Sequence, residues 1–127
     1  MSHRLRTVRV IQLPASLDRR TERAFLRELE FAMTVERPTI VIDCSHLQSI
    51  NRSGMYLLLS CLEKAMKLNG DVRLAVNPGG REDLSAHGLD RLFRTFDTNE
   101  QAVESFKRRA VFPSPFVAST LMSENAA

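Results

Sequence analysis

The stretch that decides the fold is Ile40–Leu59, which reads IVIDCSHLQSINRSGMYLLL. Together with Thr39, its first residues form an almost continuous apolar, β-branched run that ends at Cys44. Such a run is typical of a strand buried on both faces of a parallel sheet. A loop follows, and Asn51–Gly54 (NRSG) then opens a segment whose apolar residues have helical spacing. A strand, a short loop and a helix in this order predict an α/β fold.

The rest of the chain alternates strands and helices in the same way. Strands are predicted over residues 7–13, 39–44, 71–76 and 92–96. Helices are predicted over residues 21–35, from Asn51 or Ser53 to about 68, over 81–87 and from Thr98 to about 109. Asn77–Gly80 (NPGG) is predicted to be a loop. This alternation favours parallel pairing with right-handed crossovers, in a small, mostly parallel mixed sheet with about four helices.

The chain has 127 residues, enough for one domain with a core of its own. We expect this domain to span residues 1–110 and a C-terminal tail to span 111–127. For the tail, disorder and attachment to the body through Phe112 and Phe116 both stay open. No apolar run approaches the roughly 20 residues that cross a bilayer, and Met1–Arg6 lacks the apolar stretch of a signal peptide. A cytoplasmic protein without a membrane partner is therefore expected.

The basic residues are strongly biased in type and position. The net charge is +3, and arginine supplies fifteen of the 18 basic residues. Seven arginines fall between Arg4 and Arg27, with only Asp18 and Glu22 to oppose them. This distribution is compatible with a patch for nucleic acid or for an acidic partner, although a plain solvated surface is favoured. No aromatic residues are interleaved as a base-stacking platform needs, so we expect no direct nucleic-acid contact.

Side chains that could act as nucleophiles, bases or metal ligands are scattered along the sequence. We find no nucleophile–base pair, no metal-ligand spacing and no phosphate-binding glycine loop, so neither an enzyme nor a cofactor is expected. Asp43 and Ser45, at the end of the buried strand, are interpreted as anchors for the following loop rather than as catalytic groups. Cys44 and Cys61 are interpreted as small buried apolar residues, ahead of a disulfide or a reactive thiol.

The order of three motifs suggests a family. Asp43-x-Ser45, then five residues, then Asn51–Gly54 at a helix start resembles the D-x-S and D-S-S-G motifs of the STAS family, including the bacterial anti-sigma factor antagonists. Leu13–Asp18 (LPASLD) is similar to the family's L-x-G-x-L-D. The stretch from Gly88 to Val103 is similar to its C-terminal portion. The resemblance covers about residues 7–108, and it implies a single STAS-like domain that binds a partner.

The resemblance also implies how such a domain would work. In the antagonists, an anti-sigma factor with a GHKL-type serine kinase domain phosphorylates the second Ser of D-S-S-G, which corresponds to Ser53. The unphosphorylated antagonist binds this kinase and frees the sigma factor, and the phosphorylated one is released. The residues that the resemblance assigns to partner binding are Asp18, Asn51, Arg52, Ser53, Gly54 and Met55.

Two alternatives stay open. Ser53 also suits a plain helix start, because Ser is common there. Asn51 and Arg52 stand where the family has Asp and Ser, and these replacements favour a STAS module that is not phosphorylated. Such a module would be a scaffold, for instance in a lipid-transport complex, or a binder of a small ligand. A homodimer is also compatible with the sequence.

Overall fold

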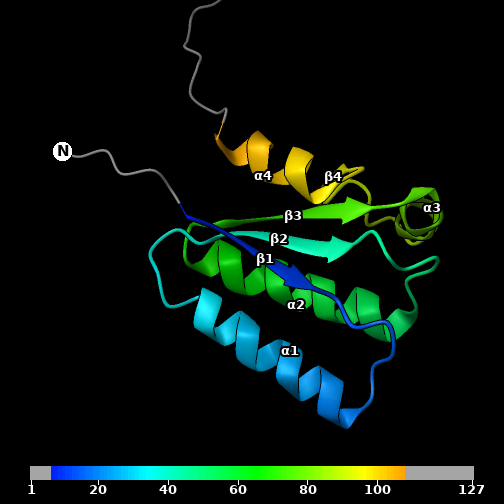
Figure 1. Ribbon diagram of the computed structural model, residues 1–127, viewed down its shortest axis with the longest axis horizontal. Coiled ribbons are helices and arrows are strands. Elements are labelled where there is room, and N and C mark those ends of the chain that lie inside the picture. Colours follow the sequence, from blue (N-terminus) through cyan, green and yellow to red (C-terminus); the bar gives the residue numbers. More distant parts are fainter. Residues whose placement is uncertain (1–6, 108–127) are drawn as a thin grey trace, which may run out of the picture.

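The structure is a computed structural model that describes residues 7–107. These residues form four strands and four helices in alternation (Figure 1). The strands are β1 (Val8–Gln12), β2 (Thr39–Cys44), β3 (Asp71–Val76) and β4 (Arg94–Phe96). The helices are α1 (Arg19–Ala32), α2 (Arg52–Lys67), α3 (Pro78–Ala86) and α4 (Asn99–Lys107).

The strands make one sheet in the order β1-β2-β3-β4, and every neighbouring pair is parallel. Because all four strands run the same way, their carboxyl ends lie at one edge of the sheet, on the right in Figure 1. The loops that lead into α1, α2 and α3 leave from this edge. The polar residues that end β1 and β2 and the starts of these helices therefore share one end of the molecule.

Helices cover both faces of the sheet. Helices α1 and α2 cover one face, α4 crosses the other face, and α3 lies at the carboxyl ends of the strands (Figure 1). The main core lies between the sheet and the first two helices, and its fully buried members include Leu29, Ile40, Ile42, Leu58 and Leu74. A smaller core under α4 is built from Val41, Ala102 and Phe106. Alternate residues of β2 thus point into two cores, as the continuous apolar run predicted.

The α/β prediction is confirmed, and β2 and β3 have the predicted bounds. The described sheet is wholly parallel rather than mixed. The predicted loop at Asn77–Gly80 is wrong, because α3 already begins at Pro78. Asn77 caps this helix by accepting a hydrogen bond from the Gly80 N–H (2.9 Å), and proline fits the first turn, where its missing N–H costs nothing. The predicted tail, 111–127, lies outside the described residues.

We predict that Leu74→Ala lowers the free energy of unfolding by about 2–5 kcal/mol, because it leaves a cavity in the middle of β3. Urea denaturation followed by circular dichroism measures this change. Leu92→Ala makes the same substitution at a side chain that is 51% exposed, so it should change stability by no more than about 0.5 kcal/mol. If both variants lost the same free energy of unfolding, the assignment of Leu74 to the core would be contradicted.

Candidate functional site

The start of α2 is the centre of the predicted site. Asn51 is its N-cap, and its side-chain oxygen accepts a hydrogen bond from the Gly54 N–H (2.8 Å). The first turn of a helix has N–H groups without intrahelical acceptors, and in α2 these include the N–H groups of Arg52 and Ser53. A neutral amide therefore caps this helix as an aspartate would, so the replacement of the family's Asp by Asn51 leaves the cap intact.

The predicted partner-binding residues divide into an exposed and a buried set. Asn51, Arg52 and Ser53 are exposed at the tip of α2. Gly54 is buried, and a Cβ atom there would lie only 3.1 Å from a methyl group of Ile50. Met55 is 5% exposed and belongs to the main core. Gly54 and Met55 therefore pack α2 against the domain, and only Asn51, Arg52 and Ser53 are open to solvent.

Side chains of β2, of the N-cap of α3 and of α3 itself hold the loop between β2 and α2. At the end of β2, Asp43 accepts hydrogen bonds from the Ser45 N–H (2.9 Å) and hydroxyl (2.6 Å). Asn77 donates to the carbonyl oxygens of Ser45 (3.1 Å) and Leu47 (2.6 Å). Asp83 of α3 accepts from the Ile50 N–H (2.8 Å), immediately before the cap of α2. The predicted role of Asp43 and Ser45 as loop anchors is confirmed, and the sequence analysis missed Asn77 and Asp83.

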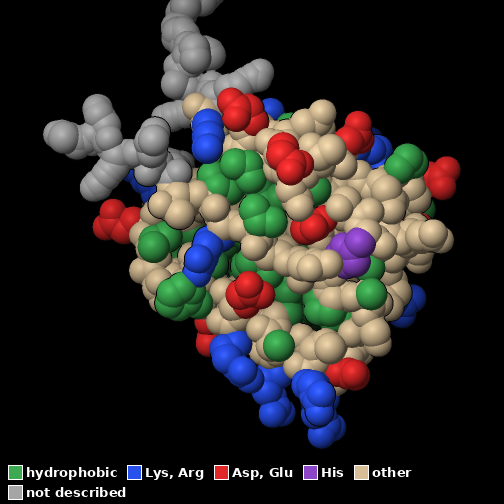
Figure 2. Space-filling view, viewed as in Figure 1, with side chains coloured by type: hydrophobic (Ala, Val, Ile, Leu, Met, Phe, Trp, Pro, Cys, Tyr) green, Lys and Arg blue, Asp and Glu red, His purple; other side chains and the backbone are tan. Residues whose placement is uncertain are grey.

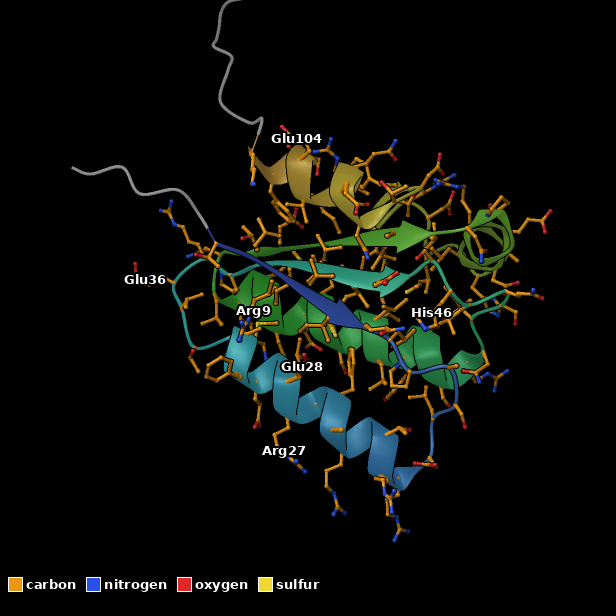
Figure 3. The ribbon with its side chains drawn as sticks, in the orientation of Figure 1. Arg9, Arg27, Glu28, Glu36, His46 and Glu104 are labelled. Carbon is orange, nitrogen blue, oxygen red and sulfur yellow. The ribbon has the colours of Figure 1, made fainter. Side chains whose placement is uncertain are left out.

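Two further contacts tie this loop to its surroundings. The His46 ring lies at the end of β1, with Nε2 2.9 Å from the carbonyl oxygen of Leu13 (Figure 3). Asn99, at the start of α4, donates to the second carboxylate oxygen of Asp43 (3.0 Å). Burial disfavours the charged form of Asp43, but hydrogen bonds from Ser45 and Asn99 outweigh it and hold the pKa of Asp43 below its ordinary value of 3.8.

Asp18 performs the same task at the start of α1 that Asn51 performs at α2. It is the N-cap, and its carboxylate accepts from the Thr21 N–H (2.9 Å) while the Thr21 hydroxyl accepts from the Asp18 N–H (2.9 Å). The bond from the Thr21 N–H lowers the pKa of Asp18 below 3.8, so this exposed carboxylate is charged at neutral pH.

The starts of α1 and α2 enclose an open hollow of about 240 Å³. We call its lining the docking face, and it consists of Leu17, Glu22, Arg52, Ser53, Tyr56 and Leu57. Tyr56 is 74% exposed, the largest value among the large apolar side chains that are exposed in the described residues. The structure therefore places Ser53 and Arg52 in a concave surface that also includes Leu17, the residue before Asp18, whereas Asp18 itself does not line the hollow.

Four members of the docking face were missed by the sequence analysis. Tyr56 and Leu57 lie one helical turn after Arg52 and Ser53, so helical spacing was a usable signal. Leu17 and Glu22 belong to the segment around the cap of α1. No local signal assigns them to the same surface as Ser53, because only the packing of α1 beside α2 brings them there.

The remaining candidate residues have structural roles or none. Cys44 and Cys61 are both free and buried, as predicted, and burial raises the pKa of each thiol to about 12. Among residues 7–107, no group of three His, Cys, Asp or Glu side chains is placed to hold a metal ion. None of the described helices is both long enough and apolar enough to cross a membrane.

Comparison with known families agrees with this geometry. The model of the STAS domain family matches residues 2–102, and the chain therefore belongs to the STAS family. STAS domains are in general regulatory or binding modules rather than enzymes. No curated protein and no solved structure shows significant similarity to the chain.

We predict that the stability of the protein falls in acid and that Asp43→Asn flattens this dependence. The folded state holds the Asp43 pKa below 3.8. The contribution of this carboxylate to the free energy of unfolding is therefore complete above pH 3.8, and it is lost as the pH falls through the pKa of the folded state. Urea denaturation at a series of pH values measures both proteins. The difference in free energy of unfolding between the wild type and Asp43→Asn should disappear on the acid side of pH 3.8. A difference that stays constant there would contradict the role of the charged carboxylate.

Proposed function

We propose that this protein is a partner-switching regulator, an anti-sigma factor antagonist that acts in the bacterial cytoplasm. It binds an anti-sigma factor that carries a GHKL-type serine kinase domain, and phosphorylation of Ser53 releases it. The observation that supports this most directly is the position of Ser53, whose exposed side chain lies in the first turn of α2 and lines the docking face.

The free protein can carry a phosphate at this position. The unbonded N–H groups of the first turn and the helix dipole both favour an anion at the start of α2. Arg52 precedes Ser53, is exposed and lines the same hollow, so it adds a positive charge nearby. The modified domain therefore needs no change of conformation to accommodate the group.

A partner seated on the docking face would meet the phosphate differently. A phosphoserine brings about −1.5 to −2 charges. Enclosing this charge in an interface without matching donors costs several kcal/mol. About 2.7 kcal/mol already weakens binding roughly a hundredfold, so one modified side chain is enough to dissociate the complex.

The rigidity of the site suits such a switch. The loop before α2 is bonded to Asp43, Asn77 and Asp83, and α2 is held by buried side chains along its length. Because this frame holds the Ser53 backbone in place, added charge acts on the partner rather than on the fold. Phosphorylation of Ser53 thus changes the charge of the surface without changing its shape.

We predict that Ser53→Asp weakens binding to the anti-sigma factor kinase encoded in the same operon by at least about tenfold, and that Ser53→Ala binds as the wild type does. Isothermal titration calorimetry measures both affinities. Incubation of the wild type with the kinase and ATP should add one phosphate, which Ser53→Ala abolishes. Ser85→Asp is the matched control, because Ser85 is exposed on α3 outside the docking face.

Two outcomes would contradict the proposal. Absence of both binding and phosphorylation would remove the kinase as the partner. Tight binding that is indifferent to Ser53→Asp, with no phosphate added, would favour a STAS scaffold or a small-ligand or lipid-transport module, the reading that Asn51 and Arg52 support.

A further inference from the structure

The helices that meet at the docking face carry charges that oppose their own dipoles. Arg19 and Arg20 open α1, and Arg52 opens α2, although a helix N-terminus is electropositive and favours acidic residues. The first turn of α1 also holds the acidic Glu22, which suits the dipole, but the first turn of α2 has no acidic residue and the last turn of α1 has no basic one. By contrast, the last turn of α2 holds Lys64 and Lys67, as the dipole favours. Helix stability therefore does not explain the arginines at the docking face.

Ion pairing within the protein does not explain them either. In the described part of the chain, the salt bridges are Arg73–Asp71 (3.1 Å) and Arg81–Asp97 (2.8 Å). Neither involves an arginine of α1 or Arg52. Figure 2 shows blue side chains gathered at the foot of the molecule, over the start of α1. These charges are exposed to solvent and are available to a partner.

Helical spacing places Arg19 beside the docking face. Arg19 is three residues before Glu22 and so lies next to it on the helix surface, and Arg23 is four residues after Arg19 on the same side of α1. Glu22 lines the docking face together with Arg52. The N-terminal segments of α1 and α2, residues 18–23 and 51–54, thus hold four exposed arginines, Arg19, Arg20, Arg23 and Arg52, against Asp18 and Glu22, a surplus of two positive charges.

We propose that these four arginines bind an acidic surface on the protein partner and speed its association with the docking face. This inference rests on the proposed function and names the chemistry of the partner. It also gives phosphorylation a second effect. The dianion on Ser53 matches the surplus of two positive charges, so it cancels the attraction at long range as well as blocking close contact.

A protein surface suits these arginines and the docking face better than a nucleic acid does. Asp18 and Glu22 lie among the arginines, and a lattice of phosphates would be repelled by both. Tyr56 is the single aromatic residue of the docking face, too little for a platform on which successive bases stack. A partner surface rich in Asp and Glu can place its own basic residue opposite Glu22.

The test compares charge-reversal variants of the full chain by their association rate with the kinase of the same operon, using surface plasmon resonance. Arg23→Glu and Arg52→Glu should each slow association about tenfold, and raising the ionic strength from about 50 to about 500 mM should shrink this difference. Glu22→Lys should speed association. Arg91→Glu is the control, because Arg91 is exposed in the turn between α3 and β4 and should change nothing.

Arg19→Glu separates binding from folding. An acid at this position suits the helix dipole, so the variant should melt at a temperature no lower than the wild type while it binds more slowly. If the wild type binds the kinase and the three arginine reversals leave the association rate unchanged, this inference alone is overturned. Absence of any binding by the wild type would overturn the proposed function and the inference with it. Arginine-dependent retention on DNA or on anionic vesicles, without an effect on the kinase, would also overturn it.

Discussion

Hydrogen bonds to the loop between β2 and α2 determine where the candidate docking face lies. Asp43 comes from β2, Asn77 is the N-cap of α3 and Asp83 lies within α3, and each satisfies backbone groups of this short loop. Unpaired backbone groups in such a partly buried loop would be costly, so these bonds specify one loop conformation. The loop in turn sets the start of α2, and with it the position of Ser53 relative to α1.

The proposed switch follows from the contrast between that fixed frame and the exposed tip of α2. A helix N-terminus tolerates an anion when water surrounds it, whereas a closed interface does not. The same dianion is therefore nearly harmless to the free domain and strongly unfavourable in the complex. Because the difference arises in the interface, regulation does not require a second conformation of the protein.

Helix stability and partner binding make opposite demands at the docking face. The arginines that open α1 and α2 are unfavourable for their own helices, yet they enlarge the positive potential that the two N-termini already produce. Local rules of stability are most often broken at functional sites, where binding compensates for the loss. The well-formed caps at Asp18 and Asn51 help to offset the cost to each helix.

The sequence by itself determined the α/β class, the bounds of β2 and β3 and the anchor at Asp43, because each depends on periodicity or on contacts a few residues apart. For the start of α2 it left Asn51 and Ser53 open, and the structure assigns the cap to Asn51. It failed at α3, where the cap at Asn77 and Pro78 was interpreted as a loop. Only the tertiary structure decided that Asn77 and Asp83 hold a loop some thirty residues earlier, and that Leu17 and Glu22 share a hollow with Ser53. Such contacts arise from packing between distant elements, and no local pattern in a single sequence encodes which helix faces which.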